Sequence, residues 1–366
     1  MPTPKYTDWF PSPHCVRTIR IVLHTVSRLK RNCPLLSDYL RRAIALLRSV
    51  FHVGCGEHRA PQPNPNNHRT AAEFIQPLYN LLPADTQIVV LDTSAARNLA
   101  HTNTTPQWVD IFAMMSHNNY SFSLADNAFA ELLSQIVSGA ITSEEALIMK
   151  CRLETFLNMK LPILPGKMDI SALIGVDKPI PDWSTDEVLE LSSQSWSFLM
   201  NAGTTKVTNQ VRTNVELQSE REAWINIFEK LGKCAETGEP LHEYKHTQLD
   251  NAFAHIDNTA PGLSPPLSTR ADLQLRLLWR QYVRSKKHSK AYDPTSPKKK
   301  NDGVDFDLYY YLYLPALIVT TDEGFFKKLK DIDSFQKEWF WKPEDLAQAW
   351  SNGKQPWARW PEEATE

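Results

Sequence analysis

The chain contains 366 residues, which allows one large domain or two ordinary ones, and its charged and apolar fractions are those of a soluble globular protein. The formal net charge of −2 excludes a partner selected by total charge alone. The charge is uneven, however, because nine lysines and arginines stand against two acids in residues 1–56, and ten against two in residues 270–300. Local basic regions of this kind can contact polyanions even on a nearly neutral protein.

Cysteine usage and hydropathy indicate the compartment. The five cysteines are an odd number without paired spacing, which is typical of a reducing environment. No apolar stretch approaches the roughly 20 residues that span a bilayer. Arg17, Arg20 and His24 interrupt the best candidate for a signal peptide. We therefore expect a cytoplasmic protein without a membrane partner.

Residues 1–69 are predicted to form a basic helical extension and a linker. Apolar residues recur at helical spacing from about residue 16 to residue 50, where Pro34 divides two basic helices. The segment HRAPQPNPNNHR (58–69) is rich in proline and asparagine, which is typical of a linker. A compact unit is expected to begin near Thr70.

Residues 70–170 alternate between predicted strands and helices. The strands are the apolar run IVVLD (88–92), the segment YSFSL (120–124) and the short stretch LPILP (161–165). Helices are predicted over residues 71–82, 106–117, 125–138 and 143–158. Two capping boxes, Ser123 with Asp126 and Thr142 with Glu145, mark the starts of the last two helices.

Residues 171–302 have a helical pattern without a convincing strand. Helices are predicted there over residues 185–201, 209–233, 241–256 and 269–287. Residues 303–366 resume the alternation, with a helix from Asp305 to Leu314, the strand ALIVTTD (316–322) and a tryptophan-rich C-terminal segment. The alternation favours an α/β fold with a parallel sheet and helices on both faces, into which residues 171–302 are inserted.

Two of the predicted strands end in an aspartate, Asp92 in IVVLDTS and Asp322 in ALIVTTD. Parallel strands deliver their carboxyl ends to one edge of the sheet, where α/β folds bind their ligands. Each aspartate taken alone is also explained as a cap of the helix that follows. Their meaning depends on whether other acids join them.

Two further stretches supply such acids. Glu131 stands among apolar residues in the first turns of the helix SLADNAFAELLSQI, either at a solvated edge or aimed into a cleft, whereas Asp126 is assigned to the capping box. Asp305 and Asp307 open the helix DFDLYYYLYLP. One of these two is expected to cap the helix, which leaves the other free to act as a ligand.

Taken in order, these stretches resemble a PIN-domain nuclease. That family has an apolar strand ending in D-T/S-S/N, then E-L in a helix, then an aspartate, then an apolar strand ending in T-x-D. The matching stretches here are IVVLDTS, FAELL, DFDLYYYLYLP and LIVTTDEGF. The resemblance covers residues 71–165 and 303–335 and implies a PIN-like, Rossmann-like sheet domain. The long helical block before the third acid departs from the compact members of the family.

The resemblance implies an acidic cluster at the carboxyl edge of the sheet. Its members would be Asp92, Glu131, Asp307 or Asp305, and Asp322. Counting back from the YLP segment selects Asp307 as the third acid, whereas counting the full helix against shorter members of the family selects Asp305. Both therefore remain candidates for the metal-binding and catalytic set.

The same resemblance implies metal-dependent hydrolysis of phosphodiester bonds, in RNA or alternatively in single-stranded DNA. Converging carboxylates repel one another, so they are stable together only with cations between them. Ligands that are all oxygen select hard ions such as Mg²⁺ or Mn²⁺. Thr93 or Ser94 would orient Asp92 by hydrogen bonding, and Thr320 belongs to the same supporting group.

A basic helix and loop are candidates for contact with nucleic acid. In ADLQLRLLWRQYVRSKKHSK the arginines recur every four residues, and a lysine cluster follows close to the third acid. The candidate residues are Arg276, Arg280, Arg284, Lys298, Lys299 and Lys300. The alternative is a solvated helix face next to a mobile loop.

Other interpretations remain open. The protein could be a catalytically silent PIN-like scaffold in an RNA-processing or defence assembly, or a toxin that is inhibited by an antitoxin. A receiver-type or flavodoxin-type domain would use the strand-end acids without Glu131. A zinc site in HVGCGEH (52–58) lacks a second ligand pair. The tyrosines of YYYLY (309–313) could stack on bases, although helical packing explains most of them.

Overall fold

The computed structural model describes nine stretches of the chain. They are residues 81–83, 85–167, 169–170, 185–202, 210–231, 247–259, 263–287, 292–299 and 301–361. The chain divides into two compact units, Met1–His68 and Arg69–Glu366, and all described residues belong to the second. The expectations for the basic extension, for HVGCGEH and for most of the helix at 71–82 lie outside the described residues. Within those residues, no helix is long and apolar enough to cross a membrane.

A four-stranded parallel sheet forms the centre of this unit, in the order β2-β1-β3-β4. The strands are β1 (Gln87–Leu91), β2 (Tyr120–Leu124), β3 (Ala316–Val319) and β4 (Phe340–Trp341). Every residue of β1, β2 and β3 is buried, as expected for strands that are covered on both faces. The predicted α/β class with a parallel sheet is confirmed.

The register of the sheet determines what meets at its carboxyl edge. Leu91 at the end of β1 pairs with Leu124 of β2 on one side and with Val319 of β3 on the other. These strand ends are therefore level, although β3 comes from the far end of the chain. Asp92, which follows β1, and Thr320, which follows β3, leave the sheet side by side.

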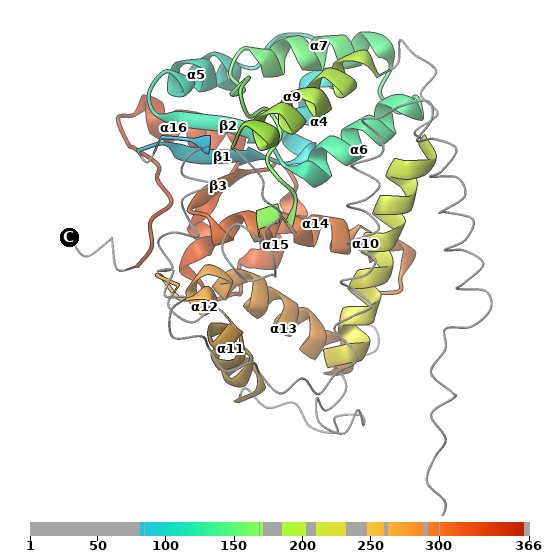
Figure 1. Cartoon of the computed structure of the whole chain (residues 1–366), viewed down its shortest axis with the longest axis vertical. Coiled ribbons are helices and arrows are strands. Elements are labelled where there is room, and N and C mark those ends of the chain that lie inside the picture. The colour runs from blue at the N-terminus through green and yellow to red at the C-terminus, as the bar shows by residue number, and fades with distance from the viewer. Residues whose placement is uncertain are drawn as a thin grey trace, which may run out of the picture. The chain divides into compact units, whose positions relative to one another are not determined.

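Helices cover both faces of the sheet (Figure 1). Figure 1 places α5, α7 and α9 on one side of the strands, and α14 and α15 on the other. The helices of the sheet domain are α4 (Thr93–His101), α5 (Gln107–Ser116), α6 (Asp126–Val137), α7 (Ser143–Glu154), α14 (Asp302–Phe306), α15 (Glu323–Leu329) and α16 (Pro343–Ser351), with the 3₁₀ helices η1 (Pro297–Lys299), η2 (Asp307–Tyr313) and η3 (Phe335–Trp339).

Between residues 185 and 287, the described secondary-structure elements of the block at 171–302 are all helices, as predicted. Its helices are α9 (Thr185–Asn201), α10 (Gln210–Leu231), α11 (Thr247–Thr259), α12 (Leu267–Arg270) and α13 (Asp272–Lys287). Helix α10 packs on α6 and α14, where the Trp224 ring lies 4.9 Å from the Phe306 ring. The inserted block therefore reaches the elements that carry the candidate acids.

Three local predictions need correction. Ser123 does not cap a helix, because it lies within β2 and its hydroxyl donates to the Leu161 carbonyl at 2.6 Å, while Ala125 is the N-cap of α6. The stretch 161–165 contributes only an isolated bridge from Ile163 to Leu124. The helix expected from Asp305 to Leu314 is instead a short α-helix followed by the 3₁₀ helix η2. The capping box of Thr142 and Glu145 is confirmed.

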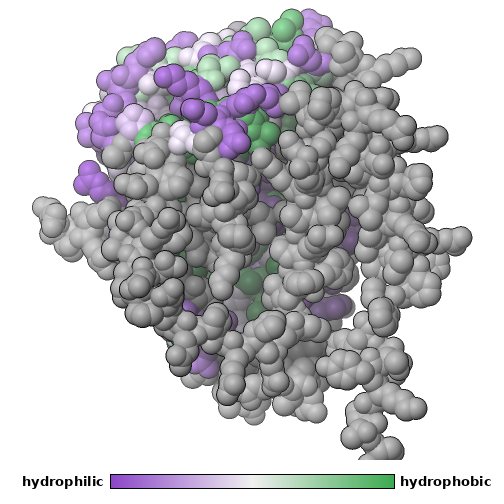
Figure 2. Space-filling view, viewed as in Figure 1, coloured by the Kyte–Doolittle hydropathy of each residue, from purple (hydrophilic) through white to green (hydrophobic). Residues whose placement is uncertain are grey.

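The described surface is mainly polar. Figure 2 shows hydrophilic residues with scattered apolar ones over the top of the unit, the region of α5 and α7. The large apolar side chains that are exposed are Met114, Leu147 and Met159. Single exposed apolar side chains of this kind are ordinary on a folded domain and indicate no docking surface.

Candidate functional site

Asp92 is buried at the carboxyl end of β1, and its role as a cap of the helix that follows is confirmed. As the N-cap of α4, its carboxylate accepts hydrogen bonds from the backbone N–H groups of Thr93 (2.7 Å) and Ser94 (3.4 Å). The hydroxyls of Ser94 (2.7 Å) and Thr320 (2.8 Å) both donate to Oδ2. Burial raises the pKa of Asp92 although these hydrogen bonds oppose the change.

Ser94 and Thr320 support Asp92, whereas the Thr93 side chain supports Glu131. Ser94 orients Asp92 through its hydroxyl, which also accepts a hydrogen bond from the Thr321 backbone N–H at 2.9 Å. The hydroxyl of Thr320, which follows β3, donates a hydrogen bond to the same carboxylate. The Thr93 hydroxyl does not reach Asp92 but donates to Glu131 Oε2 at 2.5 Å. Thr93 therefore links the two acids, with its backbone N–H on Asp92 and its hydroxyl on Glu131.

Glu131 lies on α6 beside Asp92. Burial raises its pKa and the charge of Asp92 adds to this effect, while Thr93, Arg221 and Arg97 oppose it. The bridge through Thr93 keeps this glutamate at the edge of the sheet. A receiver-type or flavodoxin-type site, the alternative in which Glu131 would take no part, is not favoured by this arrangement.

Asp305 and Asp307 face different neighbours. Burial raises the pKa of Asp305 to about 8, and the charges of Asp92, Glu131 and Asp302 add to it while Lys328 opposes it. Asp307 instead forms an ion pair with Lys167 at 2.9 Å, and Lys167 also contacts Glu220. Residues two apart on a helical segment point in different directions. The structure thus brings Asp305 to Asp92 and Glu131, and it places Asp307 elsewhere.

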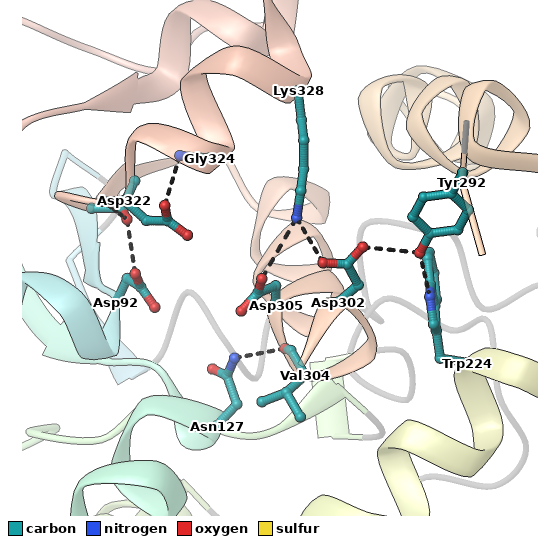
Figure 3. A network of polar contacts seen from close by, with 11 residues as sticks. Asp92, Asn127, Trp224, Tyr292, Asp302, Val304, Asp305, Asp322, Gly324 and Lys328 are labelled. Carbon is teal, nitrogen blue, oxygen red and sulfur yellow. Dashed lines mark hydrogen bonds and ion pairs between the residues drawn. The ribbon is translucent and has the colours of Figure 1, made fainter. Parts of the chain in front are cut away.

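Asp322 begins α15 and is exposed at the same edge. Its Oδ1 accepts the Gly324 backbone N–H at 2.6 Å, and its own backbone N–H donates to the Thr320 hydroxyl at 3.1 Å. A side chain at position 324 would place its Cβ 2.9 Å from that carboxylate, so the Asp322 side chain would have to shift to accommodate it. In Figure 3 the carboxylates of Asp92, Asp305 and Asp322 surround one space.

Two polar residues at this space were not anticipated. Asn127 donates its amide to the Val304 carbonyl at 2.9 Å, while its buried Oδ1 finds no hydrogen-bond partner among the described residues. The Tyr309 hydroxyl is likewise buried without a partner in the part of the chain that is described. Burial and the charges of Asp305, Asp302 and Asp322 raise the pKa of Tyr309 well above 10. Helical spacing gave a signal for Asn127, which lies four residues before Glu131 on α6.

The donor set fits a hard divalent cation in chemistry but does not form a complete ligand set. Asp92, Glu131 and Asp305 are buried or partly buried oxygen donors; the charge of Asp92 raises the pKa of Glu131, and the charges of both raise the pKa of Asp305. Asn127 adds a neutral oxygen without a partner among the described residues. Within the described residues, however, no group of three or more His, Cys, Asp or Glu side chains stands close enough to hold a metal ion. Binding Mg²⁺ or Mn²⁺ here would require the carboxylates to move together.

Lys328 places a positive charge next to two acids of α14. Lys328 Nζ lies 3.1 Å from Asp302 Oδ1 and 3.6 Å from Asp305 Oδ2. Although burial opposes it, the charges of Asp305 and Asp302 raise the pKa of Lys328. No sequence motif singled out Lys328 or Asp302, because their pairing depends on contact between α14 and α15.

The predicted nucleic-acid surface is partly engaged within the chain. Arg276 pairs with Asp272 (2.6 Å) and Arg280 with Asp331 (2.8 Å), while Arg284 and Lys298 are exposed. Lys299 lies in η1 and is partly buried, and Lys300 lies outside the described residues. Tyr309, Tyr311 and Tyr313 are buried, so packing explains these tyrosines and they do not offer faces for base stacking.

Comparison with known proteins does not identify the chain. No protein-family model, no curated protein sequence and no solved structure gives a significant match. A function for this chain therefore has to be argued from the residues at the carboxyl edge of the sheet, because function depends on sites more than on folds.

Proposed function

We propose that the chain is a metal-dependent endonuclease with a PIN-like domain, and that it hydrolyses phosphodiester bonds of single-stranded RNA. One observation carries this proposal: Asp92, Glu131 and Asp305, from three separate parts of the chain, lie close enough to interact electrostatically, with Asp92 buried and the other two partly buried. Buried carboxylates that raise one another's pKa values are costly unless a cation or a proton compensates them. Such groups are candidates for a functional site.

Each residue has a stated role in this proposal. Asp92, Glu131, Asp305 and Asp322 would hold Mg²⁺ or Mn²⁺, with Asn127 Oδ1 as a neutral donor. A bound divalent ion lowers the pKa of a water molecule and neutralises the charge of the phosphate. Ser94 and Thr320 hold Asp92 in one orientation, and Thr93 holds Glu131.

The proposed reaction is a simple hydrolysis. The oxygen of a water molecule bonds to phosphorus, and the bond from phosphorus to the leaving sugar oxygen breaks. The water gives one proton to a carboxylate, and the leaving oxygen takes a proton from solvent.

Two arginines near the cluster are candidates for binding the phosphates on either side of the cleaved bond. Arg97 on α4 is exposed, and Arg221 on α10 donates to the Asn301 side chain at 3.1 Å. Both act electrostatically on Glu131, so their guanidinium groups belong to the surroundings of the site. Arginine presents paired donors that match phosphate oxygens. The inserted helix α10 would thus take part in substrate binding.

A cleavage assay with single variants tests the proposal. Short labelled single-stranded RNA and DNA of the same sequence are incubated with Mn²⁺, Mg²⁺ or EDTA and with wild type, Asp92→Asn or the matched surface control Asp110→Asn. We expect metal-dependent cleavage by wild type and by the control, and a loss of at least about 10²-fold for Asp92→Asn. Circular dichroism confirms that each variant is folded. Equal products from wild type and Asp92→Asn, or none from either, would refute the nuclease.

The competing function is a silent scaffold that binds nucleic acid without cutting it. It is favoured by the absence, among the described side chains, of a group of three acids close enough to hold a metal ion. This alternative expects RNA binding that is independent of Mn²⁺ and the same in wild type and Asp92→Asn. Binding measured by fluorescence anisotropy beside the cleavage assay separates the two functions.

A further inference from the structure

Lys328 stands inside the group of carboxylates as a fixed positive charge. Its Nζ contacts Asp302 Oδ1 and Asp305 Oδ2 at 3.1 and 3.6 Å, and its side chain is 19% exposed. Nζ also lies 5.5 Å from the centre of the Phe325 ring. An ammonium group has three N–H donors. Among the described residues Asp302 is its hydrogen-bond acceptor and Asp305 its second ion-pair partner, which leaves N–H donors for a ligand.

The inserted helical block fixes the position of this lysine. Trp224 on α10 donates Nε1–H to the Tyr292 hydroxyl at 2.8 Å, and Tyr292 donates to Asp302 Oδ2 at 2.9 Å (Figure 3). Trp224, Tyr292 and Asp302 are all buried. Since one oxygen of Asp302 is occupied by Tyr292 and the other by Lys328, Asp302 serves as the counter-ion of Lys328.

The backbone next to Asp302 is equally constrained. A Cβ at Gly303 would lie 2.7 Å from the Glu220 carbonyl oxygen and 2.7 Å from the Trp224 Cβ. Helix α10 therefore approaches α14 so closely that only glycine fits. The segment that carries Asp302 and Asp305 is clamped against the inserted block, and the distance between the ammonium group and Asp305 is set by this packing.

We propose that Lys328 is the second cation of the site, so that the protein binds one divalent ion per chain and uses this ammonium group to contact a non-bridging oxygen of the scissile phosphate. This inference rests on the proposed function. In two-metal sites the ions stand about 3.5–4 Å apart. An ammonium group 3.6 Å from Asp305 would repel a second divalent ion at that carboxylate.

The Tyr309 hydroxyl independently indicates a ligand on this side of the cluster. It is 1% exposed, has no hydrogen-bond partner among the described residues, and lies close enough to Asp305, Asp302 and Asp322 to be affected by their charges. A buried hydroxyl without a partner is costly. A phosphate oxygen that is bound by Lys328 would provide the missing acceptor.

Titration with Mn²⁺ in the absence of nucleic acid tests the inference. Free Mn²⁺ is followed by electron paramagnetic resonance for the full chain as wild type, Lys328→Met, Lys328→Arg and the control Lys327→Met, which is exposed on the same helix. We expect one ion per chain for wild type, Lys328→Arg and Lys327→Met, and two for Lys328→Met. Methionine keeps the aliphatic stem against Phe325, and the thermal midpoint of each variant checks that it is folded.

The outcomes separate this inference from the proposed function. Two ions in wild type, or one ion in Lys328→Met, would overturn the role of Lys328 while leaving an Asp92-dependent metal site in place. Binding of no ion, or binding that Asp92→Asn does not weaken, would overturn the metal-dependent nuclease itself. A change from one ion to two that occurs only when the charge at position 328 is lost supports the inference.

Discussion

Two aspartates on the same short segment have opposite surroundings. Asp307 is paired with Lys167 at 2.9 Å, and Lys167 contacts Glu220 as well, so two acids share one cation. Asp305, only two residues away, is affected by the charges of Asp92, Glu131 and Asp302, and its counter-charge among the described residues is Lys328 at 3.6 Å. The first group holds α10 and the segment after α7 onto η2. The second group has an excess of negative charge, which is the condition for binding a cation.

The largest difference between the two acids is expected in catalysis. Asp305→Asn should lower cleavage of RNA by at least about 10²-fold, because it removes a charged oxygen from the proposed metal site. Asp307→Asn should leave the rate per folded molecule nearly unchanged. Initial rates at saturating Mn²⁺ measure both. Equal losses of activity would show that the two aspartates do not differ in function.

The next effect is on stability and has the opposite order. Asp307→Asn should lower the free energy of unfolding by about 1–3 kcal/mol, because it leaves the buried Lys167 with a weaker set of partners. Asp305→Asn should stabilise the metal-free protein, because it removes repulsion from Asp92 and Glu131. Urea denaturation in EDTA measures both changes. Destabilisation by Asp305→Asn would indicate that Lys328 already balances the cluster.

The effect of Mn²⁺ on the pH dependence of stability should distinguish the two acids further, because burial raises the pKa of both. Burial raises the pKa of Asp305 to about 8, so this group stabilises the metal-free fold at low pH, and the contribution is lost as the pH rises from about 4 through 8. Mn²⁺ should reverse this loss above neutral pH in wild type and in Asp307→Asn, but not in Asp305→Asn. Thermal midpoints from pH 5 to pH 9, with and without Mn²⁺, provide the measurement. An unchanged metal response in Asp305→Asn would exclude this residue as a ligand.

The smallest expected effect concerns the arginines. Arg97→Gln should weaken binding of single-stranded RNA a few-fold and reduce the salt dependence by roughly one phosphate contact. Arg276→Gln should do less, because Arg276 is already paired with Asp272 at 2.6 Å. Anisotropy titrations at several salt concentrations compare the two variants. A larger effect of Arg276→Gln would show that the predicted basic helix contributes more to RNA binding than Arg97 does.

The strand ends were predictable because a local pattern specifies them. Buried apolar runs that end in Asp-Thr-Ser and Thr-Thr-Asp placed Asp92 and Asp322 at the carboxyl edge of the sheet, and Glu131 stood out as an acid among apolar residues. The choice between Asp305 and Asp307 was not predictable. The chain changes from α-helix to 3₁₀ helix between them, and this change decides which acid faces Asp92.

Lys328, Asp302 and Tyr292 could not be found from the sequence, because nothing local distinguishes them from surface residues. Their roles arise when α10, α14 and α15 pack together. Asn127 was accessible in principle, since it lies one turn before Glu131 on the same helix. Ser123 was misassigned because β2 continues one residue beyond it, so the helix begins later than its capping pattern suggested.

The neighbours of β1 in the sheet have a consequence for biosynthesis. Asp92 is followed by more than two hundred residues before Thr320, its hydrogen-bond partner at the end of β3, is added. A nascent chain on the ribosome carries Asp92 and Glu131 long before it carries Asp305, Asp322 or Lys328. Under the proposed function, the acidic site would stay incomplete while the message is being translated, and a chain released early would not cut RNA.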